Sequence, residues 1–177
     1  MPQPLFIAFE GIDGSGTTTQ CSFLQQHIRE RFDCTVVATR EPGGTPTAER
    51  IRDLVLDPGL EDLNPLTELL LYAASRAQHV RELIRPALQS GTPVLCDRFA
   101  ASTVAYQGFG RGLDLQIVDQ VNNIAVGDCQ PDLTIYLDLP VAEAQARCAH
   151  RGAQRDRLEM SGVELQERVR AAYLELA

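Results

Sequence analysis

The sequence contains no lysine. All 16 of its basic residues are arginines, and with 24 aspartate and glutamate residues among 177 the formal net charge at pH 7 is −8. Such an acidic balance argues against a protein that coats nucleic acid or binds an anionic membrane surface. We therefore expect neither nucleic acid nor a membrane as a partner.

Other absences narrow the class further. No apolar stretch approaches the roughly 20 residues that a membrane-spanning helix needs, and the first four residues lack the basic segment of a signal peptide. There is no Cys-x-x-Cys pair, and no histidine has a metal-ligand spacing to a cysteine, so we expect no structural metal. The odd number of cysteines predicts reduced thiols and a cytoplasmic protein; they are Cys21, Cys34, Cys96, Cys129 and Cys148.

The chain alternates between short apolar runs and helical patterns. Four runs rich in β-branched or aromatic residues predict strands at 5–9, 35–39, 93–97 and 133–138. Unbroken apolar runs fit parallel strands covered on both faces better than strands with one face in water. Strands separated by helices predict an α/β fold of three layers, with a parallel sheet flanked by helices. Because there is no linker or repeat, we expect one domain over residues 1–177.

Capping signals bound the predicted helices. Thr45-Pro46 suits the N-cap and first residue of a helix whose inward face carries Ile51, Leu54 and Val55. A second helix is expected to follow the glycine-rich segment near residue 16, because apolar residues recur every four positions from Leu24.

Two longer helices are predicted in the same way. Asn64-Pro65 begins a helix that runs to about Ser90, before Gly91. Ser161 and Glu164 have the spacing of a capping box for the last helix of the chain.

Residues 11–18, Gly-Ile-Asp-Gly-Ser-Gly-Thr-Thr, lie between the first predicted strand and a helix. Gly11 and Gly16 have the spacing of the P-loop pattern G-x-x-x-x-G-K-[ST], and Thr18 fills the position that binds Mg²⁺. In this context backbone N–H groups and the helix N-terminus hold phosphates. Thr17, which is short and neutral, stands where the lysine belongs. The sequence of residues 11–18, which we call the phosphate loop, predicts a site for the phosphates of a nucleotide. The alternative is a glycine-rich turn that binds no ligand.

Two further segments follow predicted strands. Residues 40–45, Arg-Glu-Pro-Gly-Gly-Thr, come after the second strand, and Asp97-Arg98 ends the third. Since the carboxyl ends of parallel strands meet at one edge, we expect both segments beside the phosphate loop. At that edge the acidic Asp97 suits a metal and the basic Arg98 suits a phosphate. The alternatives are an ordinary turn for residues 40–45 and a structural salt bridge for Asp97-Arg98.

Arginines suggest two more contacts with a ligand. Tyr72 and Arg76 lie four residues apart on one helix face, where they could clasp a planar base by stacking and cation–π contact. Four arginines within eleven residues predict a mobile anion clamp, a lid around 147–158, and they are Arg147, Arg151, Arg155 and Arg157. Solvated arginines are the alternative in both cases.

Together these segments resemble the thymidylate kinases of bacteria. The resemblance runs in unbroken order from about Leu5 to Ala177 and rests on FEGIDGSG-TT, TREPGGT, LYAASR, DRF with AYQG and GRG, PDLTIYLDLP, the arginines before DRLE, and YLELA. TREPGGT and DRF…AYQG are more specific than the P-loop, which many families share. The resemblance implies a P-loop kinase fold, transfer of a phosphoryl group from ATP to dTMP with Mg²⁺, a homodimer, and a cis peptide bond before Pro42.

The resemblance also implies roles for the matching residues. The ATP phosphates would be held by the loop residues Gly11, Ile12, Asp13, Gly14, Ser15, Gly16, Thr17 and Thr18. The residues that would contact dTMP are Asp13 at the 3′-hydroxyl, Arg52 and Arg98 at the phosphate, Tyr106 at the deoxyribose, and Tyr72, Arg76, Thr103 and Gln107 around thymine. Thr18 and Asp97 would lie at Mg²⁺, and the catalytic residues would be Asp97, Arg98, Arg151 and Arg155.

The chain departs from the family pattern in two places. Thr17 lacks the charge of the P-loop lysine, and we expect arginines of the lid to supply it. Family members continue past YLELA with a fifth strand and a helix that help form the adenine pocket, so we expect the chain to be shorter than the family's full length. Two other interpretations stay open: a kinase of another nucleoside monophosphate, and a catalytically impaired nucleotide-binding protein of the same fold.

Overall fold

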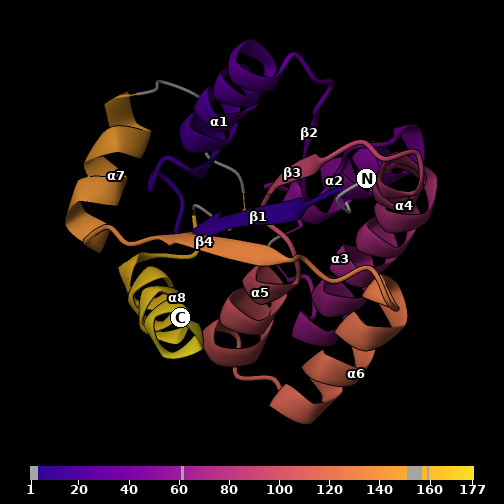
Figure 1. The fold of residues 1–177 in the computed structure, drawn as a ribbon. Helices are drawn as coiled ribbons and strands as arrows, with labels where there is room; N and C mark the ends of the chain where they lie inside the picture. The colour runs from indigo at the N-terminus through magenta and orange to yellow at the C-terminus, as the bar shows by residue number, and fades with distance from the viewer. Residues whose placement is uncertain (1–3, 61, 151–156, 159) are drawn as a thin grey trace.

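The computed structural model of the chain describes residues 4–60, 62–150, 157–158 and 160–177. Its strands form one parallel sheet in the order β2-β3-β1-β4 (Figure 1). Their bounds are β1 (Phe6–Gly11), β2 (Val37–Arg40), β3 (Val94–Asp97) and β4 (Leu133–Leu137). The four predicted strands and their parallel arrangement are therefore confirmed, with small shifts at the ends.

Helices cover both faces of this sheet (Figure 1). The first of them, α1 (Thr17–Phe32), packs on one face, and α5 (Ala100–Thr103), α6 (Leu115–Val126) and α8 (Val163–Leu176) lie on the other. The remaining helices are α2 (Pro46–Leu56), α3 (Pro65–His79), α4 (Arg85–Gln89) and α7 (Val141–His150). Two π-helical segments, η1 (Val80–Ile84) and η2 (Val104–Gly110), continue α3 and α5.

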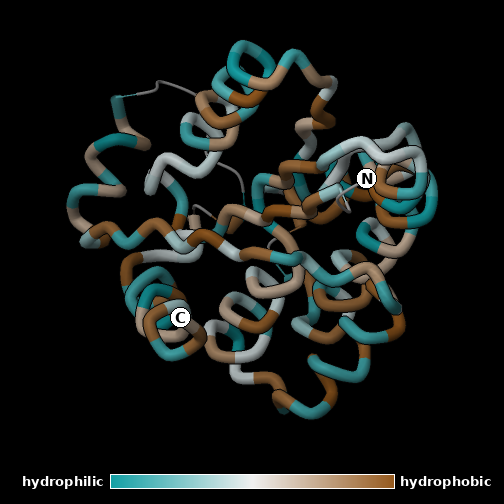
Figure 2. Tube along the Cα trace, in the orientation of Figure 1, coloured by the Kyte–Doolittle hydropathy of each residue, from teal (hydrophilic) through white to brown (hydrophobic). Residues whose placement is uncertain are grey.

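The two central strands are buried on both faces. Side chains alternate along a strand, so Phe6 and Ala8 of β1 join a cluster with Val80, whereas Ile7 and Phe9 join another with Cys21 of α1. Figure 2 shows hydrophobic residues concentrated along these strands. The unbroken apolar runs therefore predicted correctly that β1 and β3 are covered on both faces. The same prediction is wrong for β2 and β4, which form the edges of the sheet and whose residues are all half-buried or exposed.

Two of the predicted helix starts are confirmed by their caps. The side chain of Thr45 accepts a hydrogen bond from the Ala48 N–H, and that of Asn64 accepts from the Leu66 N–H. The helical segment that begins after Asn64 runs through η1 and α4 to Gln89, close to the predicted end. Gly91 follows with φ +82, a conformation that glycine adopts without strain.

Two sequence-based expectations about the helices fail. Leu54 was expected to face inward but is 47% exposed, because α2 packs only a narrow face against α3. Ser161 does not cap α8: its hydroxyl donates to the Arg157 carbonyl, and Gly162 takes the N-cap position without a side-chain bond. The helical patterns of α6 and α7 were not recognised in the sequence.

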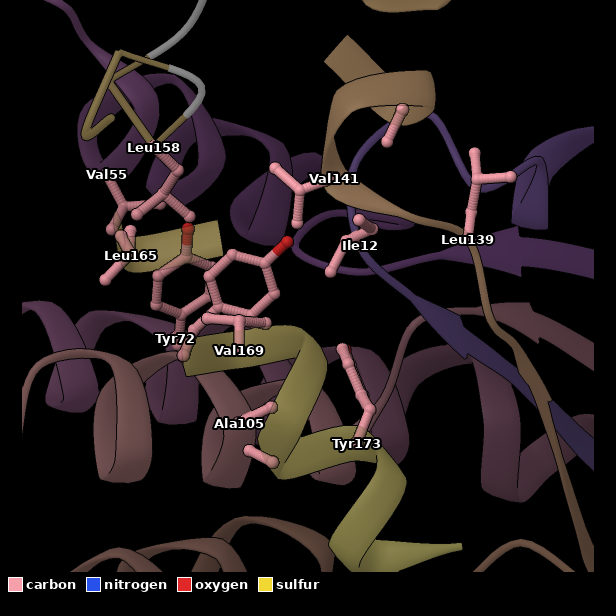
Figure 3. Close-up of a cluster of buried hydrophobic side chains, with 13 residues drawn as sticks. Ile12, Val55, Tyr72, Ala105, Leu139, Val141, Leu158, Leu165, Val169 and Tyr173 are labelled. Carbon is pink, nitrogen blue, oxygen red and sulfur yellow. The ribbon is translucent and has the colours of Figure 1, made fainter. Parts of the chain in front are cut away.

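A third cluster of buried side chains lies under the phosphate loop. Ile12, the second residue of that loop, packs with Val141 of α7 and with Val169 and Tyr173 of α8 (Figure 3). The two C-terminal helices therefore support the loop from behind, and they tie its position to the core.

The central strands should dominate stability. Leu95 of β3 is 0% exposed, so Leu95→Ala should lower the free energy of unfolding by about 2–5 kcal/mol, through lost burial and the cavity left behind. Leu133 of the edge strand β4 is 51% exposed, and Leu133→Ala should cost less than about 1 kcal/mol. Urea unfolding of both variants measures the difference, and equal losses would contradict this account of the core.

Candidate active site

A cavity of about 410 Å³ opens at the carboxyl edge of the sheet. It is lined by segments that are far apart in the sequence: the phosphate loop, the end of β2, α3, the end of β3, and η2. The predicted site residues that line it are Asp13, Gly14, Gly16, Thr17, Thr18, Arg52, Tyr72, Arg76, Asp97, Arg98, Thr103, Tyr106 and Gln107. The structure thus brings together nearly all of the residues expected to contact ATP, Mg²⁺ and dTMP.

Three predicted loop residues lie behind the cavity wall. Gly11 ends the buried strand β1, Ile12 belongs to the hydrophobic core, and Ser15 is buried with its N–H bonded to the Ile12 carbonyl. Two glycines shape the turn between them and α1. Gly14 has φ +88, and a Cβ there would lie 2.5 Å from the Ala144 carbonyl oxygen. Gly16 has φ +100, and apart from its neighbours in the chain no described heavy atom lies within 4 Å of a Cβ placed there, so the loop backbone is open at this point.

The lysine position of the loop is occupied by a buried, uncharged side chain. Thr17 is 5% exposed and is the first residue of α1. Its side chain is too short to reach across the cavity as a lysine would. Among the described residues, the positive charge on the cavity wall comes from five arginines, namely Arg40, Arg52, Arg76, Arg98 and Arg147.

Thr18 and Asp97 are in hydrogen-bond contact at the end of the phosphate loop. The Thr18 hydroxyl donates a hydrogen bond to Asp97 Oδ2. Asp97 Oδ1 is buried and has no hydrogen-bond partner within the described parts of the chain. The Thr18 hydroxyl and the Asp97 carboxylate, with its Oδ1 not hydrogen-bonded to the described residues, offer the oxygen ligands that Mg²⁺ prefers. The described residues include no group of three or more histidine, cysteine or acidic side chains that could hold a metal by themselves.

Asp97 and Arg98 are neighbours in sequence but point to different partners. Arg98 has φ +70, and its guanidinium donates to Asp13 Oδ1 at 2.7 Å and to the Gly11 carbonyl. Tyr106 donates to the other Asp13 oxygen at 3.1 Å, and its ring lies 5.5 Å from the Arg98 guanidinium. In the described parts of the chain Asp97 and Arg98 form no salt bridge with each other: Arg98 pairs with Asp13, and Asp97 accepts from Thr18.

Arg76 is held in the cavity wall by four hydrogen bonds. It is 2% exposed, and its Nε donates to Glu41 Oε2 at 2.7 Å. Its Nη1 donates to Thr103 Oγ1 and Asn122 Oδ1, both at 2.8 Å, and Nη2 donates to the Phe99 carbonyl at 3.0 Å. The cation–π contact that we expected Arg76 to offer a ligand is made with the Phe99 ring, at 5.4 Å.

The segment after β2 is held by a buried ion pair that the sequence analysis missed. Glu41 accepts from Arg76 on one oxygen and lies 2.9 Å from His79 Nδ1 on the other. His79 is 0% exposed, and its Nε2 is 2.7 Å from the Thr39 hydroxyl. The peptide bond between Glu41 and Pro42 is cis, as the resemblance implied. The signal for this network was present, because His79 lies three residues after Arg76 on the same helix face.

Comparison with known proteins agrees with this geometry. The family model described as thymidylate kinase matches residues 9–177. The chain is 53% identical over 173 residues to a thymidylate kinase of Desulforudis audaxviator, covering 98% of this chain and 77% of the relative. It is 52% identical over 177 residues to one of Geobacter sulfurreducens, covering 97% and 83%. The chain belongs to the thymidylate kinase family.

A solved structure supports the same conclusion for the fold. The crystal structure of thymidylate kinase from Ehrlichia chaffeensis superposes with a TM-score of 0.81 at 37% identity, over 99% of this chain and 87% of the other. The P-loop kinase fold of the thymidylate kinase family is thus confirmed.

The predicted thymidylate kinase lid is only partly covered by the structure. Arg151 and Arg155 lie outside the described residues. Arg147 lines the cavity, with its Nη1 3.5 Å from the Gly14 carbonyl oxygen. Arg157 was expected in a mobile clamp but is 6% exposed and forms an ion pair with buried Glu68 at 2.6 Å. That expectation is wrong, because a buried carboxylate on α3 needs the arginine as its counter-charge.

A second missed group is the buried carboxylate of Glu10, at the end of β1. It accepts hydrogen bonds from the Phe99 N–H, from Ser102 and from Tyr173 of α8. Burial raises the pKa of Glu10, although these hydrogen bonds and the nearby Arg98 act against that rise. A carboxylate within an apolar strand was the signal, because a buried acid must have donors around it.

Arg40, on the cavity wall, is held by Glu49 of α2. Its Nη1 and Nη2 donate to the two Glu49 oxygens at 2.8 and 3.0 Å, and the Gly44 N–H donates to Oε1 at 2.7 Å. These donors, Arg40 first, lower the pKa of Glu49 to about 2.

This pair gives a pH dependence to stability. The pKa of a glutamate in an unfolded chain is about 4.3, above the folded value of about 2, so the pair stabilises the fold above that range and less as the pH falls toward 2. Both side chains are more than a third exposed, so Glu49→Gln should cost less than about 1 kcal/mol at pH 7. Urea unfolding at pH 7, 5, 4 and 3 should show the difference shrinking. A difference that stays constant with pH would contradict the assignment.

Proposed function

We propose that this chain is a dTMP kinase, which transfers the γ-phosphoryl group of ATP to dTMP and yields ADP and dTDP. The observation that carries the proposal is the composition of one cavity. Residues of the phosphate loop and residues that match the family's dTMP contacts line the same space of about 410 Å³. A protein that catalyses phosphoryl transfer mainly positions the two phosphates in line and neutralises their charge.

We propose that the ATP phosphates bind residues 11–18. The backbone is open at Gly16, and the N-terminus of α1 begins at the next residue, so N–H groups are available to phosphate oxygens. Thr18 and Asp97, whose Oδ1 has no protein partner among the described residues, would hold Mg²⁺. When bound with ATP, Mg²⁺ would neutralise charge on the phosphates.

dTMP would occupy the opposite side of the cavity. Asp13, which Arg98 and Tyr106 hold in place, is positioned to accept a hydrogen bond from the 3′-hydroxyl. Arg98 and Arg52 would bind the dTMP phosphate, and Tyr106 would pack on the deoxyribose. Thymine would lie among the residues of α3, α5 and η2 that line the cavity, namely Tyr72, Arg76, Thr103 and Gln107.

Arginines would replace the missing lysine charge. A charge-assisted hydrogen bond from lysine to phosphate is worth roughly 1.5–3 kcal/mol, and an arginine supplied to a transferring phosphoryl group is worth on the order of 10³ to 10⁵ in rate. Arg147 already lies beside the loop at Gly14. We propose that it acts with Arg151 and Arg155, which lie outside the described residues, in a lid around 147–158 of a single kinase domain.

The alternative of a catalytically impaired binding protein is not supported. Relatives about half identical over nearly the whole chain are thymidylate kinases. The same relatives favour dTMP over another nucleoside monophosphate as the acceptor.

The first test compares the chain with its Thr17→Lys variant. We expect robust dTDP formation from Mg-ATP and dTMP by the chain as it stands. Restoring the lysine should change kcat by less than about tenfold, because arginines already supply the charge. That change is smaller than the effect expected from one new charge-assisted hydrogen bond. Nucleotide separation after timed incubation measures dTDP, and Arg98→Ala is the inactive control. Turnover that appears only with the lysine would contradict the proposal.

We further propose a homodimer. The neighbouring helices α3 and α6 carry exposed apolar side chains, which are Leu66, Leu70, Ile117 and Ile124, the last 75% exposed. Exposed apolar side chains on neighbouring helices suit a protein interface, and the resemblance implies a second copy of this chain as the partner.

The dimer proposal predicts a surface-charge effect. Ile124→Glu places a charge on this apolar face and should convert a dimer to a monomer in sedimentation analysis. Phe23→Glu is the matched control, because Phe23 is 60% exposed but lies on α1 and should leave the mass unchanged. A wild-type monomer at micromolar concentration, or equal effects of both variants, would contradict the dimer.

A cytoplasmic location is also a proposal. All five cysteines are free thiols, a state typical of reducing compartments. Among the described helices, none combines the length and the apolar character that crossing a membrane requires.

A further inference from the structure

A buried carboxylate next to the cavity has no role in the functions proposed above. Glu68 is 0% exposed and lies on α3, one turn before Tyr72. Its Oε2 forms ion pairs with Arg157 at 2.6 Å and with Arg111 at 3.2 Å. Arg111 Nε also donates to Oε1, at 3.3 Å. Arginine has only donors, so both oxygens of Glu68 act as acceptors.

The same carboxylate determines which way the Gln107 amide faces. Gln107 Nε2 lies 2.7 Å from Glu68 Oε1. An oxygen of Gln107 placed there would face an acceptor at hydrogen-bond distance, so the NH₂ group must point to Glu68. Gln107 is 2% exposed and lines the cavity. The carbonyl oxygen, on the other branch of the amide, is then the polar atom that Gln107 offers to the cavity.

Donors accompany this acceptor on the same wall. The Thr103 hydroxyl oxygen accepts from Arg76 Nη1 at 2.8 Å, which leaves its hydrogen available to donate. Four of the five Arg76 N–H groups have partners in the described parts of the chain, which fixes the direction of the remaining Nη2 hydrogen. An acceptor on the same wall as donors suits a pyrimidine edge that has an N–H beside carbonyl groups. Thymine has that edge at N3, whereas cytosine has an unprotonated N3 beside an amino group.

We propose that Glu68 is a specificity-determining positioning residue: by holding the Gln107 amide with its carbonyl oxygen toward the cavity, it selects a pyrimidine with a protonated N3 over cytosine. The inference rests on the proposed dTMP site and goes beyond it, because Glu68 itself does not touch the base. A reversed amide would present a donor to N3–H and leave both groups without a partner, which is the costly outcome in a buried site.

The test compares binding of two ligands by the whole protein. dTMP and 5-methyl-dCMP share the methyl group and differ only at N3 and C4, so titration calorimetry of both isolates the recognition of that edge. The wild type should prefer dTMP by at least about tenfold, the worth of one buried hydrogen bond. Glu68→Gln keeps the shape but can donate as well as accept, so the Gln107 amide is free to turn over. This variant should lose most of the preference, mainly through weaker dTMP binding.

A matched variant separates positioning from general disruption. Arg111→Gln removes one charge from the same cluster but leaves Glu68 an acceptor, so the preference should persist. Equal loss in both variants, or full preference in a folded Glu68→Gln protein, would overturn the inference while leaving dTMP binding intact. If Glu68→Gln does not fold, the Gln107→Leu variant tests the inference instead. A preference for dTMP that persists in Gln107→Leu would show that the Gln107 amide is not its source. No dTMP binding by the wild type would instead refute the proposed function itself.

Discussion

Buried carboxylates must be paired with donors or cations, and this constraint organises the cavity. Glu10, Glu41 and Glu68 are each nearly inaccessible to water. They are satisfied by groups from distant segments: Glu10 by α8 and the start of α5, Glu41 by Arg76 and a histidine, and Glu68 by two arginines and an amide. Each acid therefore joins elements that lie on or behind the cavity wall, and a shift of one of them would leave a charge without its partner.

These acids also keep the arginines in place. Arg76 would have several rotamers if it were solvated, but Glu41 and three other acceptors leave it one. Asp13 does the same for Arg98 at the end of β3. A pre-positioned guanidinium loses little conformational entropy when a phosphate or a base binds. In a chain without lysine, such fixed arginines supply positive charge to the described part of the cavity wall.

The local features of the fold were predictable because they depend on a few neighbouring residues. Thr45 and Asn64 cap helices through hydrogen bonds to residues two or three positions away, and the strands β1 and β3 can be recognised from their unbroken apolar runs. The errors came where a distant partner intervened. Ser161 has capping-box spacing, but the Arg157 carbonyl takes its hydroxyl. Arg157 was expected in a mobile clamp with three other arginines, but it is buried against Glu68, which lies 89 positions away in the chain.

The sequence by itself determined the phosphate loop, the parallel α/β fold and the family, since these follow from glycine spacing, apolar periodicity and short motifs in a fixed order. Only the tertiary structure decided which side chains share a wall and which way they face. The order β2-β3-β1-β4 brings Asp97 to Thr18 and Arg98 to Asp13 across more than 70 residues. The physical reason is that a hydrogen bond or an ion pair depends on distance and direction in space, which sequence spacing specifies only within one helix or strand.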